Sequence, residues 1–138
     1  MRARALVLAL LAFAQPASAE NGVYHRMSRL SPAEQASRDE LNAMITRHAQ
    51  ANDVPEALVH RVVMHESRYH PRIVGPGGCY GLMQIKHATA RAMGYTGPAS
   101  GLLDAETNLT YAVKYLAAAY RKANKNAERA ILYYARGF

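Results

Sequence analysis

The sequence predicts a mostly α-helical single domain with one small irregular or β insertion. Apolar residues recur at spacings of three and four over several segments, which is the pattern of helices that bury one face. Serine, aspartate or asparagine precedes three of these segments, as expected for residues that cap helices. Glycine and proline are densest in residues 71–81, where they predict turns. The 138 residues fit one domain with an adequate core.

The first predicted helix follows a capping box and ends near Asn52. Ser31 is the expected N-cap, Pro32 suits the first turn, and Glu34 stands three residues after the cap. Its periodic positions are Leu41, Met44, Ile45 and His48.

The second predicted helix starts at Pro55 and ends before Pro71, because a residue that precedes proline disfavours helical angles. Its buried stripe consists of Leu58, Val59, Val62 and Val63. Residues 71–81 then predict a turn-rich loop or a short β-ribbon. This is the insertion in the otherwise helical chain.

The C-terminal half predicts three further helices. A short helix over residues 88–93 is followed by a loop over residues 94–103. A long helix runs from its cap Asp104 to about Lys122, and Asn126 caps the last helix.

Residues 1–19 have the three parts of a secretory signal peptide. Arg2 and Arg4 give a basic start, residues 5–14 are mostly apolar, and residues 17–19 form a small-x-small cleavage site. The apolar run is far shorter than the ~20 residues of a membrane span. We therefore expect cleavage after Ala19, export to the periplasm or cell wall, and no membrane span in the mature chain. Residues 20–30 are expected to be a flexible lead and residues 31–138 the folded domain.

Charge and cysteine content narrow the partners. The formal charge is +7, or +5 once Arg2 and Arg4 leave with the signal, and basic surfaces attract anionic polymers. The export signal argues against nucleic acid and favours the bacterial wall, although charge alone fits an ordinary solubilising surface equally well. Cys79 is the only cysteine, so an internal disulfide is excluded and packing is its expected role.

Glu66 is the strongest candidate for chemistry. It follows Val59, Val62 and Val63 by seven, four and three residues, so it continues their apolar stripe. A carboxyl against an apolar wall is costly to ionise, and a protonated carboxyl can act as a general acid on a glycosidic oxygen. The alternative is a surface glutamate in the last helical turn, or one paired with Arg68.

No second carboxylate has an obvious catalytic place. The acids after Glu66 are Asp104, Glu106 and Glu128, and each stands at a cap or in the first turn of a predicted helix. A single carboxylate suits a mechanism that needs no external water. It would protonate the leaving oxygen and then take the proton from the sugar's own hydroxyl.

Metal and phosphate chemistry are disfavoured. His65-Glu66 matches the start of a His-Glu-x-x-His zinc motif, but the next histidine is His70, about 140° away around the helix. The glycines near Pro76 lack the Gly-Lys-Ser/Thr of a phosphate loop. We therefore expect no metal and no cofactor. Nine tyrosines and no tryptophan suit sugar stacking or core packing, and Tyr134 is the one for which we prefer a sugar contact.

From about Leu41 to Gly137 the order of motifs resembles that of the lytic transglycosylase catalytic domain, of the SLT type. The matching motifs are Glu66-Ser67, Gly81-Leu82-Met83-Gln84-Ile85 with Thr89-Ala90, Asp104 with Asn108-Leu109 and Tyr115-Leu116, and Tyr134-Ala135-Arg136-Gly137. Three positions depart from the family pattern: Gly75 often has serine, Lys86 is often apolar, and Ala135 is usually asparagine.

This resemblance implies a mostly α, lysozyme-like (goose-type) single domain over residues 31–138 and peptidoglycan glycan strands as the partner. It also implies cleavage of the MurNAc–GlcNAc β-1,4 bond without hydrolysis, giving 1,6-anhydro-muramyl products. Glu66 would be the catalytic acid/base, and the expected substrate-binding residues are Ser67, Met83, Gln84, Asn108 and Tyr134. Gly81 would supply the backbone freedom that lets Met83 and Gln84 point into a cleft.

Two rivals stay open at this point. One is a peptidoglycan hydrolase of the same fold, and the other is a non-catalytic wall-binding protein of a secretion apparatus. Partners from secretion systems or wall synthesis are also open.

The cleavage site gives a direct prediction. Because Ala17 and Ala19 flank a small-x-small site, the exported protein should begin at Glu20. N-terminal sequencing of the exported protein measures this. A chain that still begins at Met1 would instead carry the segment as an anchor.

Overall fold

The computed structural model describes residues 30–138. The predicted signal peptide and nearly all of the predicted lead lie outside the described residues. The elements in order are α2 (Pro32–Ala51), α3 (Glu56–Ser67), β1 (Val74–Gly75), β2 (Cys79–Tyr80), β3 (Ile85–Lys86), α4 (His87–Ala92), the 3-10 helix η1 (Ala99–Leu103), α5 (Ala105–Lys122) and α6 (Ala127–Arg136). Among the described residues, no helix combines the length and the apolar character needed to cross a bilayer.

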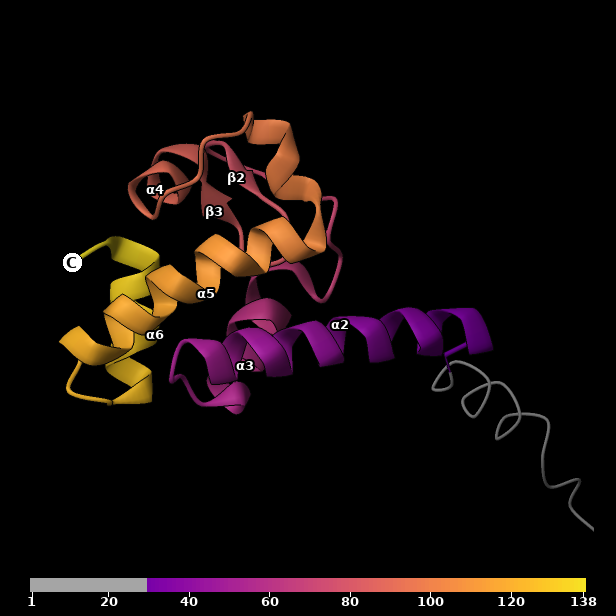
Figure 1. The fold of residues 1–138 in the computed structure, drawn as a ribbon, viewed down its shortest axis with the longest axis horizontal. Helices are drawn as coiled ribbons and strands as arrows, with labels where there is room; N and C mark the ends of the chain where they lie inside the picture. Colours follow the sequence, from indigo (N-terminus) through magenta and orange to yellow (C-terminus); the bar gives the residue numbers. More distant parts are fainter. Residues whose placement is uncertain (1–29) are drawn as a thin grey trace, which may run out of the picture.

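Helix α5 lies at the centre of the molecule (Figure 1). It packs against α2, which in turn packs against α3, and its C-terminal half packs against α6. The small sheet, α4 and η1 lie on the opposite side of α5 from α2. The predicted class, helical with one small β insertion, is therefore the observed one.

The predicted helix starts are confirmed by their caps. Ser31 and Glu34 form a complete capping box at α2. The Asp104 side chain accepts a hydrogen bond from the Thr107 amide at 2.9 Å and starts α5. The Asn126 side chain caps α6 in the same way.

Helix α3 ends before Pro71, as predicted, but for another reason. It stops at Ser67 because Arg68 and Tyr69 take left-handed angles with φ of 50° and 64°. The Arg68 amide then donates to the Met64 carbonyl at 3.2 Å and closes the last turn. The predicted loop over residues 94–103 contains η1, which is too short to show an apolar repeat.

The insertion after α3 is a three-stranded antiparallel ribbon in the order β1-β2-β3. Gly77 and Gly78 turn the chain between β1 and β2, with φ of 75° and 74°. In the β2–β3 pair, Cys79 lies opposite Lys86. Residues opposite each other on paired strands project to the same face, so these two side chains share one side of the ribbon.

The core is built around α5. Its largest fully buried side chains come from α2, α3, η1, α5 and the turn before β3, and they are Ile45, Val59, Val63, Leu82, Met83, Leu102, Leu109, Val113 and Leu116. The described part of the chain needs no disulfide, since these side chains form one continuous cluster.

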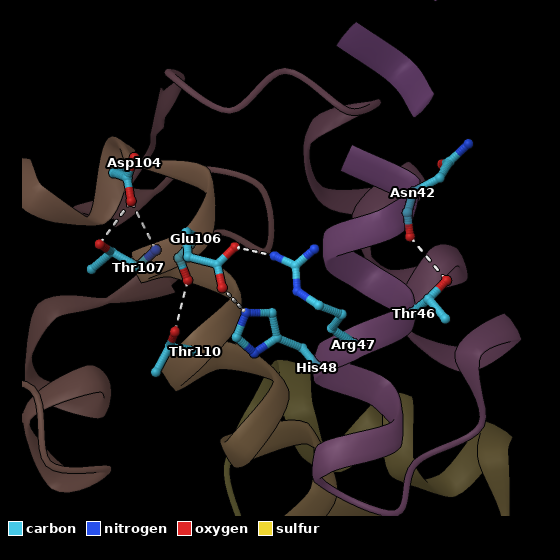
Figure 2. A network of polar contacts seen from close by, with 8 residues as sticks. All are labelled: Asn42, Thr46, Arg47, His48, Asp104, Glu106, Thr107 and Thr110. Carbon is cyan, nitrogen blue, oxygen red and sulfur yellow. Dashed lines mark hydrogen bonds and ion pairs between the residues drawn. The ribbon is translucent and has the colours of Figure 1, made fainter. Parts of the chain in front are cut away.

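A polar cluster also links α2 to α5 (Figure 2). The Glu106 carboxylate accepts a hydrogen bond from Arg47 Nη2 at 2.9 Å and lies 2.8 Å from His48 Nε2. The Arg47 and Glu106 side chains are 60% and 47% exposed, so solvent screens their attraction. This cluster orients the first turn of α5 and adds little to stability.

Burial and the polar cluster give unequal predictions for stability. Leu116→Ala should lower the free energy of unfolding by about 3 kcal/mol, because it removes a fully buried side chain and leaves a cavity. Glu106→Gln should lower it by less than about 1 kcal/mol, the usual size for an exposed ion pair. Urea unfolding of both variants measures this. A larger loss in the Glu106 variant would contradict the central role of the α5 core.

Candidate functional site

The end of α3, the ribbon, α5 and the end of α6 enclose a cleft of about 350 Å³. It is lined by Glu66, Cys79, Gln84, Ile85, Lys86, Thr89, Tyr115, Tyr134, Ala135, Arg136 and Gly137. Three of the six predicted site residues, Glu66, Gln84 and Tyr134, therefore come together on its wall.

Glu66 stands in the last turn of α3, next to the buried stripe. Val62 and Val63, one turn before it, are almost completely buried, whereas the Glu66 side chain is 27% exposed. Its Oε1 lies 3.1 Å from Nδ1 of His65, whose side chain is open to solvent. The carboxyl is thus half-sheltered by the core and accessible from the cleft. Among residues 30–138, Glu66 is the only acidic residue that lines the cleft.

A second hollow of about 460 Å³ lies between α3 and α6 and is mostly apolar. Its lining residues are His60, Arg61, Val62, Met64, His65, Glu66, Ile131 and Tyr134. Since Glu66 and Tyr134 also line the first cleft, the two hollows meet at these side chains. A long ligand that occupies both hollows would pass over the Glu66 carboxyl.

Tyr134 connects α6 to the turn before β3. Its hydroxyl donates a hydrogen bond to the Met83 carbonyl at 2.8 Å, and its ring packs on Tyr115 with centroids 5.3 Å apart. Burial raises the pKa of the Tyr134 hydroxyl well above its ordinary value, and the nearby Glu66 carboxylate raises it further. The phenol therefore stays neutral at physiological pH. With its proton committed to Met83, its oxygen can accept a hydrogen bond from the cleft.

Gln84 reaches the cleft from a left-handed backbone position, with φ of 48°. Its Nε2 donates to the Gly81 carbonyl at 3.0 Å and to the Ile73 carbonyl at 3.2 Å. A Cβ added at Gly75 would overlap Gln84 Oε1. The position of this amide thus depends on the absence of a side chain at Gly75, one of the three departures from the family pattern.

Asn108 lies behind the cleft wall. It is fully buried, its Nδ2 donates to the Tyr80 and Leu102 carbonyls at 2.8 and 2.9 Å, and its Oδ1 accepts from the Met83 amide at 3.0 Å. Gly81 has φ of 71°, and a Cβ there would overlap Leu102 O and Asn108 Nδ2. The amide thus holds the turn that carries Gln84, and glycine is needed at its start.

Met83 and Ser67 also face inward, unlike the expectation that they contact substrate. The Met83 side chain is fully buried in the core, and only its backbone groups serve the site. Ser67 is 4% exposed, and its hydroxyl donates to the Val63 carbonyl at 3.1 Å. With Asn108, these side chains are the ones that the structure does not bring to the cleft surface. Met83 belongs to a turn in which residues 81–83 are all buried, and Ser67 and Asn108 are buried residues of α3 and α5.

Sequence reasoning missed Cys79 as a lining residue. The sequence holds no signal for it, because two-residue strands show no alternating pattern. In the structure Cys79 lies opposite Lys86, so both project from the same face of the ribbon. The sequence marks Lys86 only as a departure from the family pattern, and it places Tyr115 in a matching motif without a role in the site. In the structure both line the cleft, and Tyr115 packs on Tyr134.

The other downstream acids are engaged elsewhere. Asp104 caps α5 and Glu106 contacts α2. Glu128 accepts two hydrogen bonds from Arg61 at 2.8 and 3.0 Å, and this pairing lowers the pKa of its carboxyl. Within residues 30–138, histidine, cysteine and acidic side chains form no group of three that could hold a metal ion.

Residues 43–138 match the family model described as the transglycosylase SLT domain. The chain is 30% identical over 92 residues to the soluble lytic murein transglycosylase of Escherichia coli K12. This match covers 62% of the chain and 14% of that protein. It is 32% identical over 99 residues to the peptidoglycan transglycosylase gp16 of Escherichia phage T7. This second match covers 70% of the chain and 8% of that protein. The chain thus spans far less than two thirds of either relative.

Two solved structures share the fold. The complex of the 70-kDa soluble lytic transglycosylase with bulgecin A superimposes with a TM-score of 0.66 at 29% identity, over 70% of this chain and 17% of that one. The 70-kDa soluble lytic transglycosylase of Escherichia coli gives a TM-score of 0.65 at 26% identity, over 70% and 16% of the two chains. They confirm the lysozyme-like fold that the motifs implied.

The buried amide gives a prediction about the cleft wall. Asn108→Ala should lower the free energy of unfolding by roughly 3 kcal/mol, because it leaves a buried amide and two carbonyls without partners. Activity should fall with it, since the turn that holds Gln84 loses its support. Thermal unfolding measures the loss. Gln50→Ala, at an exposed amide side chain within α2, is the control, and equal stability of the two variants would contradict this role.

Proposed function

The chain belongs to the transglycosylase SLT domain family, and from this premise we propose that it is a peptidoglycan lytic transglycosylase. It cleaves the MurNAc–GlcNAc β-1,4 bond of glycan strands and leaves a 1,6-anhydro-muramyl end. The names of the relatives support this substrate, since one is a murein transglycosylase and another a peptidoglycan transglycosylase.

One observation carries the proposal: in the part of the chain that the structure describes, Glu66 is the only carboxylic acid that lines either hollow. Glycosidases that use water or a covalent intermediate place two carboxyls about 5–10 Å apart on either side of the scissile bond. Here the other downstream acids are used as a cap or as ion pairs. A single carboxyl favours a reaction in which the same group gives and then takes the proton.

In the first step, Glu66 donates its proton to the glycosidic oxygen. The bond between that oxygen and the muramyl C1 breaks, and the GlcNAc hydroxyl leaves with the proton. The muramyl N-acetyl oxygen meets the positive charge that develops at C1, so that no second carboxylate is required.

In the second step, the muramyl 6-hydroxyl attacks C1 and the N-acetyl oxygen is released. The Glu66 carboxylate takes the hydroxyl proton, which restores the acid for the next cycle. Intramolecular attack is favoured by proximity, which can be worth ~7 kcal/mol or more in well-oriented systems. Water is neither consumed nor required.

The remaining cleft residues hold the sugar for these steps. The Tyr134 oxygen accepts a hydrogen bond from the sugar, because its own proton is committed to Met83. Gln84 Oε1 can accept a second one, because the amide nitrogen is already used inside the protein. Met83, Asn108 and Ser67 act from behind the wall as positioning residues.

We also propose that the protein acts in the periplasm or cell wall. The support is the signal-peptide pattern of residues 1–19 and the location of its substrate. Proteins of secretion or wall synthesis remain its proposed partners, because local opening of the wall serves both processes.

The product distinguishes the proposal from its rival. Digestion of purified peptidoglycan should release muropeptides that are lighter by one water than those a hydrolase gives, with no new reducing ends. Mass analysis of the soluble products measures this. Mainly reducing-end muropeptides would show that water is the nucleophile, and no release at all would favour a wall-binding protein.

The role of Glu66 gives a prediction of its own. Glu66→Gln should lower the turnover rate at least ~100-fold, because an essential acid/base is lost, while the fold stays intact. Release of soluble muropeptides from purified peptidoglycan measures the rate. Glu128→Gln changes the same residue type outside the cleft and should keep the wild-type rate. Near-normal release by the folded Glu66 variant would reject the assignment.

A further inference from the structure

We propose that Lys86 and Arg136 form a carboxylate-binding site at the rim of the cleft, here called the cationic rim. Its ligands are the carboxylates of the stem peptides that peptidoglycan carries beside the scissile bond. This inference rests on the proposed function and specifies how the cleft recognises its substrate.

The two cations reach the cleft from separate elements. Lys86 is the last residue of β3, and Arg136 is the last residue of α6. Both line the cleft that contains Glu66. Figure 1 shows the C-terminal end of α6 on the side of α5 that also carries β3 and α4. A ligand at Glu66 therefore has a positive group on each of two walls.

Neither cation is neutralised by the fold. Both side chains are exposed, and neither forms an ion pair within residues 30–138. By contrast, Arg47 and Arg61 are paired with carboxylates elsewhere on the surface. The one acid in the cleft, Glu66, has His65 as its contact. The charge of the cationic rim is therefore available to a ligand.

Local structure does not account for a lysine at position 86. Lys86 is the N-cap of α4, but its ammonium group has no acceptor with which to cap the helix. A positive charge at a helix N-terminus is also opposed by the helix dipole. Arg136 suits the C-terminus of α6, but this attraction does not require its side chain to line the cleft. Placement in the cleft is the property that the two cations share.

The strand register fixes the direction of Lys86. Its partner across the β2–β3 pair is Cys79, which also lines the cleft. The lysine thus extends from a paired strand toward the ligand space. Arg136 follows Tyr134 by two residues in the last turn of α6. Its backbone is therefore held close to Tyr134, which lines the cleft with Glu66.

Stem-peptide carboxylates fit this site chemically. They are flexible and stand away from the sugar ring, so exposed cations at a rim can reach them without burial. Exposed ion pairs change an equilibrium constant by up to about fivefold each, and salt weakens them. The cationic rim is therefore expected to tune the preference for carboxylate-bearing substrate.

Binding to two forms of one polymer tests the proposal. The first is purified peptidoglycan freed of other wall polymers, and the second is the same material with its carboxylates converted to methylamides. The mature chain carries Glu66→Gln so that the polymer is not degraded, and binding is measured by sedimentation at low salt. The variants are Lys86→Gln, Arg136→Gln and the double variant. Lys122→Gln is the matched control, because it removes an exposed lysine outside the cleft.

The chain with an intact cationic rim should bind the native polymer about tenfold more tightly than the methylamidated one. Each single variant should lower this ratio roughly three- to fivefold, and the double variant should bring it close to one. Lys86→Arg and Lys122→Gln should keep the original ratio. A ratio near one for the intact rim, or an unchanged ratio in the double variant, would overturn the inference.

The proposed function is judged by a separate readout, the release of muropeptides by the chain with Glu66 intact. If muropeptides are released but native polymer is not preferred, the cationic rim is rejected and the proposed function stands. If native polymer is preferred but no muropeptides are released, the proposed function is rejected and the cationic rim stands.

Discussion

The buried Asn108 side chain is the constraint on which the cleft depends. Its amide joins three backbone groups, at Tyr80, Met83 and Leu102, and no water can replace these contacts because the residue is fully buried. Asn108 belongs to α5, the helix at the centre of the core. The turn before β3 is therefore fixed to the helix that supplies the largest share of the buried core. Gly81 lets the chain approach this amide closely enough to be held.

Two further contacts extend this constraint to Tyr134, which lines the cleft with Glu66. The Met83 amide is held by Asn108, and the Met83 carbonyl accepts the proton of Tyr134. That bond sets the direction of the phenol beside Glu66, and burial keeps the phenol neutral. A polar group in the core thus determines how Tyr134 is oriented at the cleft wall. The same bond ties α6 to the turn before β3.

The sequence predicted the helical class, the caps and the three side chains that meet at the cleft, because these depend on local patterns and on motif order. It could not predict which motif residues face inward. Met83 and Gln84 are neighbours in a turn whose φ angles follow no repeat, and only Gln84 reaches the cleft. Likewise, two-residue strands are too short to show an alternating pattern, so Cys79 and its register with Lys86 could be found only from the structure.

The departures from the family pattern also gain a physical meaning in three dimensions. Gly75 leaves the space that Gln84 Oε1 occupies, so a side chain at position 75 would displace the Gln84 amide. Lys86 adds a charge to the same cleft, and Ala135 stands between Tyr134 and the exposed Arg136. None of these positions supports Asn108 or shelters Glu66. These three positions can therefore differ from the family pattern while the position of Glu66 is kept.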